Sequence, residues 1–190
     1  DLGRIEDGSK KLFKVLANKQ VPIQCFKIQG SRFNTDSFNY FKIFISNAPN
    51  LKELDISNTN ISITDIGMLI NLIQANQSIT QFKLHLNSMQ LNGSTLETFV
   101  GFFNGHILNK WEGLGLENNG MKKKDLQLLI PLLQKMPNLS WINLSNNFAS
   151  SMKGIDTELE NLGMRPILPL VTFQFKYQMF FPSNSFSQVH

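Results

Sequence analysis

The chain has 190 residues, of which 42% are hydrophobic, and its formal net charge is +4. That length and hydrophobic content allow a sizeable core, so we expect one folded domain over residues 1–190. The charge excess is small, and its one lysine run, 122–124, has no aromatic residues interleaved with it, so a nucleic-acid partner is not expected.

Residues 1–22 begin the chain with a helical pattern. Leu12, Val15 and Leu16 fall on one face of a helix, as in the helical part of a longer strand-and-helix unit. We interpret the segment as the remnant of an upstream unit. The chain also starts at Asp1 and not at a methionine, which is expected if it belongs to a longer protein.

From residue 23 onward one short pattern occurs five times, with copies starting at residues 23, 51, 79, 111 and 139. Apolar residues fill the first, fourth, sixth and eleventh places of nearly every copy. Each copy predicts a short strand, centred on residues 26–28, 54–56, 82–84, 114–116 and 142–144. The spacings are 28, 28, 32 and 28 residues, and the four extra residues before Trp111 predict a longer loop at about residues 104–109.

The stretches between the copies carry a helical period. Ile66, Leu69, Ile70 and Ile73 follow the i, i+3, i+4, i+7 spacing of one helix face, and equivalent stripes precede the fourth and fifth copies. Each unit is therefore a strand followed by a helix, and neither element can bury its apolar face alone. Stacked neighbours would share one continuous core.

The pattern L-x-x-L-x-L-x-x-N-x-L, repeated over residues 23–162, resembles that of leucine-rich repeat proteins of the ribonuclease-inhibitor-like subclass. That subclass includes ribonuclease inhibitor, the activating protein of the Ran GTPase, tropomodulin and the CARMIL actin regulators. The asparagine-rich units look most like the cytoskeletal and signalling members, such as the CARMIL proteins. The resemblance implies an α/β fold: a right-handed α/β horseshoe solenoid with a curved parallel sheet on the concave face and helices on the convex face.

The ninth place of the pattern holds Ser31, Thr59, Asn87, Asn119 and Asn147. At this place the chain leaves the strand, so backbone groups would be buried without sheet partners. An asparagine amide offers donors and an acceptor to satisfy them. We therefore expect a structural asparagine ladder of Asn87, Asn119 and Asn147, and looser packing in the first two units, which have Ser31 and Thr59 instead.

The third, fifth and seventh places should face outward from the sheet, because successive strand residues point to opposite faces. These places supply the candidate partner-binding residues: Glu53, Asp55, Lys83, His85, Glu117, Trp141 and Asn143. Lys27, Asp55 and Lys83 are expected as neighbours of alternating charge.

Trp141 stands out among these residues. Gly113 and Gly115 on the neighbouring strand should leave a bare patch beside it that could admit a partner's side chain. A tryptophan on such a face is typical of an interface anchor. The alternative is that the C-terminal strand or an adjacent side chain covers it.

The C-terminal segment, 163–190, departs from the repeat. Its residues alternate from Val171 through Phe173, Phe175, Tyr177 and Met179, which predicts a divergent strand that caps the sheet. The alternative is a disordered or foreign tail. Residues 182–190 are expected to be mobile.

The sequence gives little reason to expect catalysis. Its three histidines are not spaced as metal ligands, and Cys25 and His85 lie two repeats apart, about 10 Å, which is too far for a hydrogen bond. No strand is followed by a glycine-rich phosphate loop. We expect no enzyme activity, no catalytic residues, no metal and no cofactor.

Two functions remain open at this stage. The first is a scaffold that binds a partner protein of unknown identity through the concave face and loop edges, as a monomer or part of a longer chain. The alternative is a GTPase-activating protein built on the same solenoid, as one member of the resembling family is. The single cysteine favours a reducing compartment, the cytoplasm, and no apolar run is long enough for membrane insertion.

Overall fold

The computed structural model describes residues 6–18, 21–147, 165–167 and 178–180. In chain order these residues form α1 (Glu6–Asn18), β1 (Cys25–Lys27), α2 (Thr35–Ser46), β2 (Glu53–Asp55), α3 (Ile63–Ala75), β3 (Phe82–His85), α4 (Gly93–Gly101), β4 (Trp111–Gly115), α5 (Lys123–Gln134), β5 (Trp141–Asn143), β6 (Arg165–Ile167) and β7 (Gln178–Phe180). Each predicted strand centre overlaps an observed strand.

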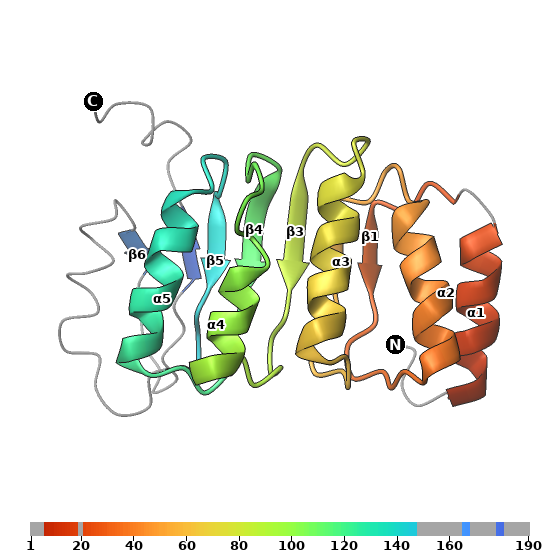
Figure 1. The fold of residues 1–190 in the computed structure, drawn as a ribbon, viewed down its shortest axis with the longest axis horizontal. Helices are drawn as coiled ribbons and strands as arrows, with labels where there is room; N and C mark the ends of the chain where they lie inside the picture. Colours follow the sequence, from red (N-terminus) through yellow and green to blue (C-terminus); the bar gives the residue numbers. More distant parts are fainter. Residues whose placement is uncertain (1–5, 19–20, 148–164, 168–177, 181–190) are drawn as a thin grey trace.

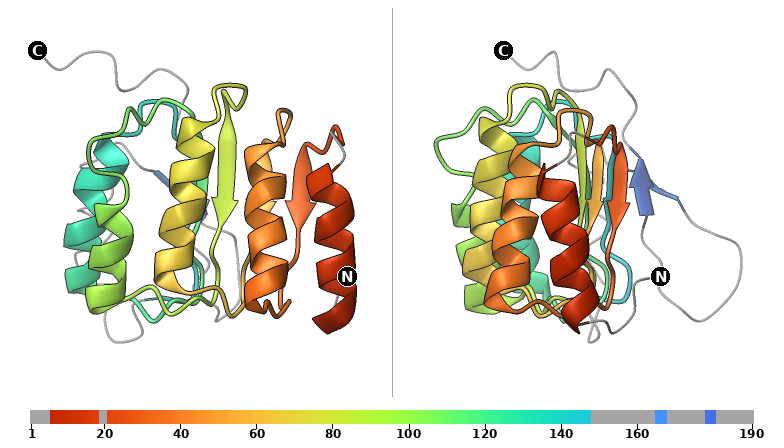
Figure 2. Two further views of the ribbon diagram at one scale, coloured as in Figure 1. Left: turned by 45° about the vertical axis from the view of Figure 1, so that its right-hand side comes forward. Right: turned by 90° about the vertical axis from the view of Figure 1, so that its right-hand side faces the viewer.

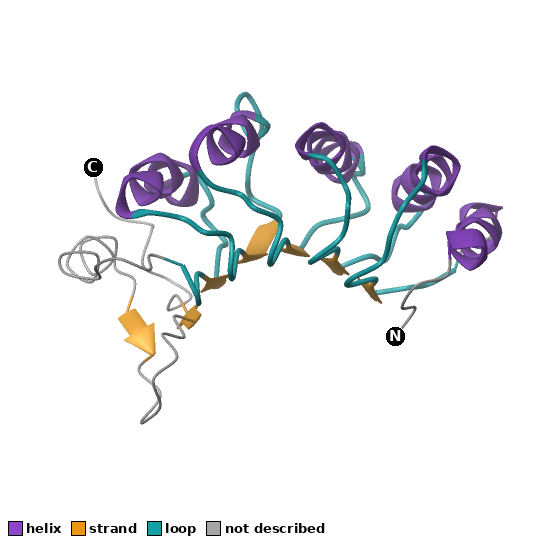
Figure 3. Ribbon diagram, turned by 90° about the horizontal axis from the view of Figure 1, so that it is seen from below, coloured by secondary structure: helices purple, strands orange, loops and turns teal. Residues whose placement is uncertain are grey.

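Strands β1 to β5 are parallel, and each pairs with the next strand in the sequence. All five helices lie on one side of this sheet (Figures 1 and 2). Seen along the strands, the elements follow an arc with the strands inside and the helices outside (Figure 3). The prediction of an α/β protein whose parallel strands alternate with helices is confirmed. We call each strand with the helix after it a unit, so β1–α2 is the first and β4–α5 the fourth.

The core lies between the sheet and the helices. Leu54 of β2 is fully buried, and so are Ile70 and Ile73 of α3, which come from the predicted helical stripe. Strands β2 to β5 each contribute buried aliphatic side chains to this core, because each strand turns alternate residues toward the helix layer. One cluster of buried apolar side chains therefore runs through all units.

Local hydrogen bonds fix where the helices begin. Asn34 precedes α2, and its side chain accepts the backbone N–H of Ser37 at 2.9 Å. Ser62 plays the same part for α3 and accepts the N–H of Asp65 at 3.1 Å. These side chains satisfy backbone donors that have no partner inside the helix.

The register of the sheet corrects the predicted alignment of the third copy. The equivalent residues of the five strands are Cys25, Glu53, Lys83, Gly113 and Trp141, which are 28, 30, 30 and 28 residues apart. The sequence pattern had placed the third copy two residues too early. Apolar residues at 82, 84 and 86 fit the pattern at either position, and a shift of two residues keeps every side chain on the same face of the sheet.

The predicted insertion before Trp111 is therefore the wrong size. The segments from strand to helix have equal lengths, and the second and third spacings are longer by two residues each on the return from helix to strand. The predicted loop at residues 104–109 does lie within the non-helical segment 102–110. The extra residues are thus divided between the returns after α3 and after α4.

Helix α1 packs against α2 at one end of the arc (Figure 1). Phe13, Leu16 and Ala17 are its buried residues. Val15, expected on the buried face, is 52% exposed. Of the predicted stripe, Leu16 is buried and Leu12 packs against the core, while Phe13 and Ala17 take the buried positions in place of Val15.

At the other end, β7 pairs with β5 and β6 pairs with β7, both antiparallel. A strand does therefore lie beside β5, the last of the parallel strands, but it is antiparallel to them. The alternating residues from Val171 to Tyr177, the part 148–162 of the fifth predicted repeat and the tail 182–190 lie outside the described residues.

Candidate functional site

The predicted binding residues lie on the sheet face opposite the helices, in columns that run across the strands. The first column is Cys25, Glu53, Lys83, Gly113 and Trp141, and the second is Lys27, Asp55, His85, Gly115 and Asn143. Backbone hydrogen bonds just beyond the strands continue the register into a third column of Gln29, Ser57, Asn87, Glu117 and Ser145. The corrected register moves Lys83 into the first column, His85 into the second and Asn87 into the third.

Two of the predicted surface residues are buried. Asp55 is 3% exposed and Asn143 is 5% exposed. Each accepts the backbone N–H two residues further on, Asp55 from Ser57 and Asn143 from Ser145, at 3.0 Å in both cases. Their side chains hold the turn that follows the strand, which explains why they are not free on the surface as expected.

Trp141 and His85 form the most prominent feature of this face. They belong to β5 and β3, which are separated by β4, yet their ring centroids are only 5.0 Å apart. Strands two spacings apart are about 9.6 Å distant, so the two rings lean toward each other over β4. Both rings remain partly exposed.

The glycines of β4 make this contact possible. A Cβ at Gly113 would lie 3.0 Å from Cε3 of Trp141, and a Cβ at Gly115 would lie 2.9 Å from Nδ1 of His85. The expected bare patch beside Trp141 is therefore occupied by side chains of the protein itself. The Trp141–His85 pair therefore takes the place of the bare patch on this face.

The charged residues near this pair do not follow the predicted order of Lys27, Asp55 and Lys83. Lys27 pairs with Glu53 at 2.8 Å, and Glu53 faces Lys83 across the next strand. The hydrogen bond from Lys27 lowers the pKa of Glu53 and raises that of Lys27. The expected alternation of Lys27, Asp55 and Lys83 is wrong because Lys83 lies in the other column.

The surroundings of His85 disfavour its charged form. Burial lowers its pKa, and the charges of Asp55 and Glu53 oppose that shift without cancelling it. Its Nε2 lies 3.5 Å from a carboxylate oxygen of Glu53 and makes no hydrogen bond. Cys25 lies in the first column of β1, and partial burial together with Glu53 raises the pKa of its thiol, which favours the protonated form.

Glu117 organises the third column. Its carboxylate accepts the side-chain amides of Asn143 at 3.0 Å and Asn146 at 2.7 Å. Its own backbone N–H donates to Oδ1 of Asn87 at 2.8 Å. The backbone of Asn87 in turn donates to the hydroxyl of Ser57 at 3.0 Å, so the second, third and fourth units and β5 are linked along this column.

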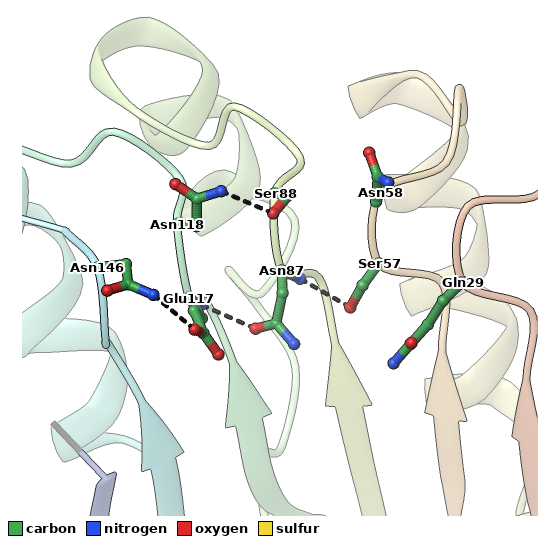
Figure 4. A pocket seen from close by; sticks show the side chains of 8 residues that line it. All are labelled: Gln29, Ser57, Asn58, Asn87, Ser88, Glu117, Asn118 and Asn146. Carbon is green, nitrogen blue, oxygen red and sulfur yellow. Dashed lines mark hydrogen bonds between the residues drawn. The ribbon is translucent and has the colours of Figure 1, made fainter. Parts of the chain in front are cut away.

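A polar groove of about 310 Å³ crosses the strand ends at this column (Figure 4). Its lining consists of amides, hydroxyls and one carboxylate, from Gln29, Ser57, Asn58, Asn87, Ser88, Glu117, Asn118 and Asn146. We call it the amide groove. Among the predicted residues, only Glu117 and Asn87 line it, and Asn87 is expected from the sequence in the asparagine ladder and not at a binding site.

The signal that could have found the amide groove is a turn residue that recurs once per unit. Gly30, Asn58, Ser88, Asn118 and Asn146 all have a positive φ, between 53° and 69°. Glycine and asparagine adopt this conformation more readily than most residues. Aligning the units on these residues would have given the correct register and placed Asn87 on the sheet face.

The asparagine ladder is shorter than predicted. Asn119 accepts the backbone N–H groups of Met89 and Leu91, at 2.8 and 3.1 Å, and donates to the carbonyl of Leu86 at 2.9 Å. Asn147 makes equivalent bonds one unit later, accepting from Asn119 at 2.9 Å. Asn87 is not part of this ladder, since Met89 occupies the equivalent place in the third unit.

One further contact was not predicted. The ammonium of Lys110 donates to three carbonyls at the end of α3, those of Ile73, Gln74 and Asn76, at 3.0 to 3.1 Å. Burial lowers its pKa. A cation at a helix C-terminus satisfies unpaired carbonyls, so Lys110 secures the return between α4 and β4 to the preceding unit.

No protein-family model matches the chain, and no curated protein shows significant similarity to it. Within the described ranges, no three residues among His, Cys, Asp and Glu come together as a metal site. Among the helices that the structure describes, none has the length and apolar character of a membrane span.

Proposed function

We propose that the chain is a leucine-rich repeat solenoid of the ribonuclease-inhibitor-like subclass that serves as a protein-binding scaffold. A partner protein would dock on the concave sheet face, with the Trp141–His85 pair at its centre. Strands that pair in chain order, helices on one side only and a recurring turn residue support the repeat assignment.

The observation that carries the binding proposal is the Trp141–His85 pair, both of whose rings remain partly exposed on the sheet face. Glycines on β4 let the two rings meet, and part of the indole stays in contact with water. Tryptophan is enriched among residues that dominate binding energy, because it combines that area with a hydrogen-bond donor. The charges of Lys27, Glu53 and Lys83 around it form a polar rim.

The test begins with photo-crosslinking. A photoreactive amino acid at Lys83, beside the aromatic pair, would capture a partner that can be identified by mass spectrometry. Affinity for the purified partner is then measured for the wild type, Trp141→Ala and Trp141→Phe. We expect Trp141→Ala to weaken binding by about 2 kcal/mol or more and Trp141→Phe to retain part of it.

Tyr40→Ala serves as the control, since Tyr40 is a partly buried aromatic on α2, in the helix layer. Circular dichroism should show the same fold for all variants. Equal affinity of the wild type and Trp141→Ala would remove this face as the binding site. A turnover assay with a panel of small GTPases separates the scaffold from a GTPase-activating protein, because a scaffold leaves the rate of hydrolysis unchanged.

A further inference from the structure

The amide groove differs in chemistry from the rest of the sheet face. Its eight lining residues include five side-chain amides and two hydroxyls, but no aromatic ring and no cationic side chain. Glu117 supplies its only charge. Such a lining presents hydrogen-bond donors and acceptors and little apolar surface. Its ligand must therefore be rich in polar groups.

The groove runs across several strands, and its polar groups repeat at the spacing of the strands. It extends from Gln29 of the first unit to Asn146 at the end of β5, across four strand spacings or about 19 Å. An extended polypeptide rises about 3.3 Å per residue, so about six residues would cover that distance. Amides that recur along a line can pair with the backbone N–H and C=O groups of such a segment.

Several groove amides have hydrogen-bonding atoms available. The side chain of Asn58 is exposed and makes no hydrogen bond within the described part of the chain. Asn87 uses Oδ1 to accept from Glu117, while its Nδ2 points away from Glu117 on the side of Gln29 (Figure 4). Asn118 donates through Nδ2 to Ser88 at 3.0 Å and leaves Oδ1 to accept. Consecutive units thus present free donors and acceptors.

Glu117 adds a preference for charge. Two of the positions at which its carboxylate can accept hydrogen bonds are taken by Asn143 and Asn146. A carboxylate has about four such positions, so it can still accept from a guanidinium or ammonium group. No lysine, arginine or histidine lines the groove to compete for it.

We propose that the amide groove binds a segment of polypeptide in extended conformation that carries an arginine or lysine opposite Glu117. This inference rests on the proposed function, since the segment would belong to the partner protein, and it adds the form and charge of what is bound. The lining disfavours other polymers: single-stranded nucleic acid requires cations and stacking rings, and glycans usually stack on aromatic side chains.

The experiment uses a phage-displayed library of random ten-residue peptides, selected on the immobilised full chain. We expect enrichment of peptides with an arginine or lysine. Fluorescence anisotropy then gives their affinity for the wild type, for Asn58→Gly combined with Asn118→Gly, and for Glu117→Gln. Glycine suits the positive φ of both asparagines, so the double variant removes amides without straining the backbone.

The double variant should bind the selected peptides about tenfold more weakly, the equivalent of one or two hydrogen bonds. Glu117→Gln should abolish the advantage of arginine-containing peptides over their alanine-substituted forms. Two controls match these changes. Gln90→Gly alters an exposed residue of positive φ outside the groove, and Glu112→Gln removes a carboxylate of β4 that does not line the groove. Both should bind as the wild type does.

Peptides that bind all groove variants as tightly as the wild type would overturn the inference, and so would a chain that selects no peptide but binds a glycan array or single-stranded RNA through the groove. The two proposals fail separately. A partner that depends on Trp141 but not on Asn58, Asn118 or Glu117 leaves the scaffold standing without the amide groove. Peptides that depend on the groove but not on Trp141 support the amide groove and not a binding site centred on Trp141.

Discussion

The N-terminal and C-terminal ends of the row of units are held together by different kinds of contact. Around the first unit, rings pack on one another with centroids between 4.9 and 6.3 Å apart, and they belong to Phe13, Phe26, Phe33, Phe38, Phe41 and Phe44. Around the fourth unit, buried amides of Asn119 and Asn147 bind the backbone of the preceding unit instead. The first unit is thus packed against α1 by apolar rings, whereas the fourth unit is joined to the third by directional hydrogen bonds.

The ladder place of the second unit shows which hydrogen bonds are missing toward the N-terminal end. In the second unit this place holds Thr59, whose hydroxyl donates to the carbonyl of Ile56 at 2.8 Å and reaches no backbone N–H of the first unit. The next residue, Asn60, exchanges hydrogen bonds of 2.7 and 2.9 Å with the backbone of Phe33. The junction between the first and second units therefore has fewer buried amide bonds. The phenylalanine cluster lies on the other side of the first unit, where it joins that unit to α1 by burying apolar area.

The largest effect is expected from Phe41→Ala. Phe41 is fully buried and contacts the rings of five other residues, namely Phe13, Phe26, Phe33, Phe38 and Phe44. Its removal leaves a cavity between α1 and the first unit and should lower the free energy of unfolding by about 3–5 kcal/mol. Urea denaturation measures the loss. A decrease below about 1 kcal/mol would show that the cluster is not what holds the first unit.

A smaller loss is expected from Asn119→Ala. The change leaves the backbone N–H groups of Met89 and Leu91 and the carbonyl of Leu86 buried without a partner. It should cost about 1–3 kcal/mol, again measured by urea denaturation. Thr59→Ala, at the equivalent place of the second unit, removes one hydrogen bond and should cost about 0.5–1.5 kcal/mol. Equal losses for the two variants would contradict the distinction between the junctions.

The smallest effect concerns pH at the middle of the sheet. Burial lowers the pKa of His85 in the folded state, so between that value and the ordinary one near 6.5 the unfolded chain binds more protons. Stability should therefore fall as pH drops below about 6.5 and stop falling, as far as His85 is concerned, below its folded pKa. Melting temperatures of the wild type and His85→Gln at pH 7.5 and 5.5 provide the measurement.

His85→Gln should lose less stability over this range, because glutamine does not titrate. The comparison of the two proteins removes the contributions of other groups, including Glu53, whose pKa is lowered by Lys27 and whose stabilising contribution is lost only at more acidic pH. An identical decrease in both proteins would mean that His85 carries the same proton in the folded and unfolded states.

The sequence alone determined the elements and the side of the sheet on which each residue lies. The apolar period of Ile66, Leu69, Ile70 and Ile73 identified α3, and the alternation around Leu54 identified β2, because burial on one face imposes a period that is visible in a single chain. The roles of Asn119 and Asn147 were also readable, since a polar residue at a buried turn must satisfy backbone groups.

Only the tertiary structure decided which residues meet across the strands. A shift of two residues leaves the alternation unchanged, so the apolar pattern of the third copy could not distinguish Lys83 from Gln81 as the neighbour of Glu53. That register places Asn87 in the amide groove, and it brings His85 within reach of Trp141 over the glycines of β4. Such contacts depend on the relative position of segments about 30 residues apart, which the turn geometry and packing of whole units determine.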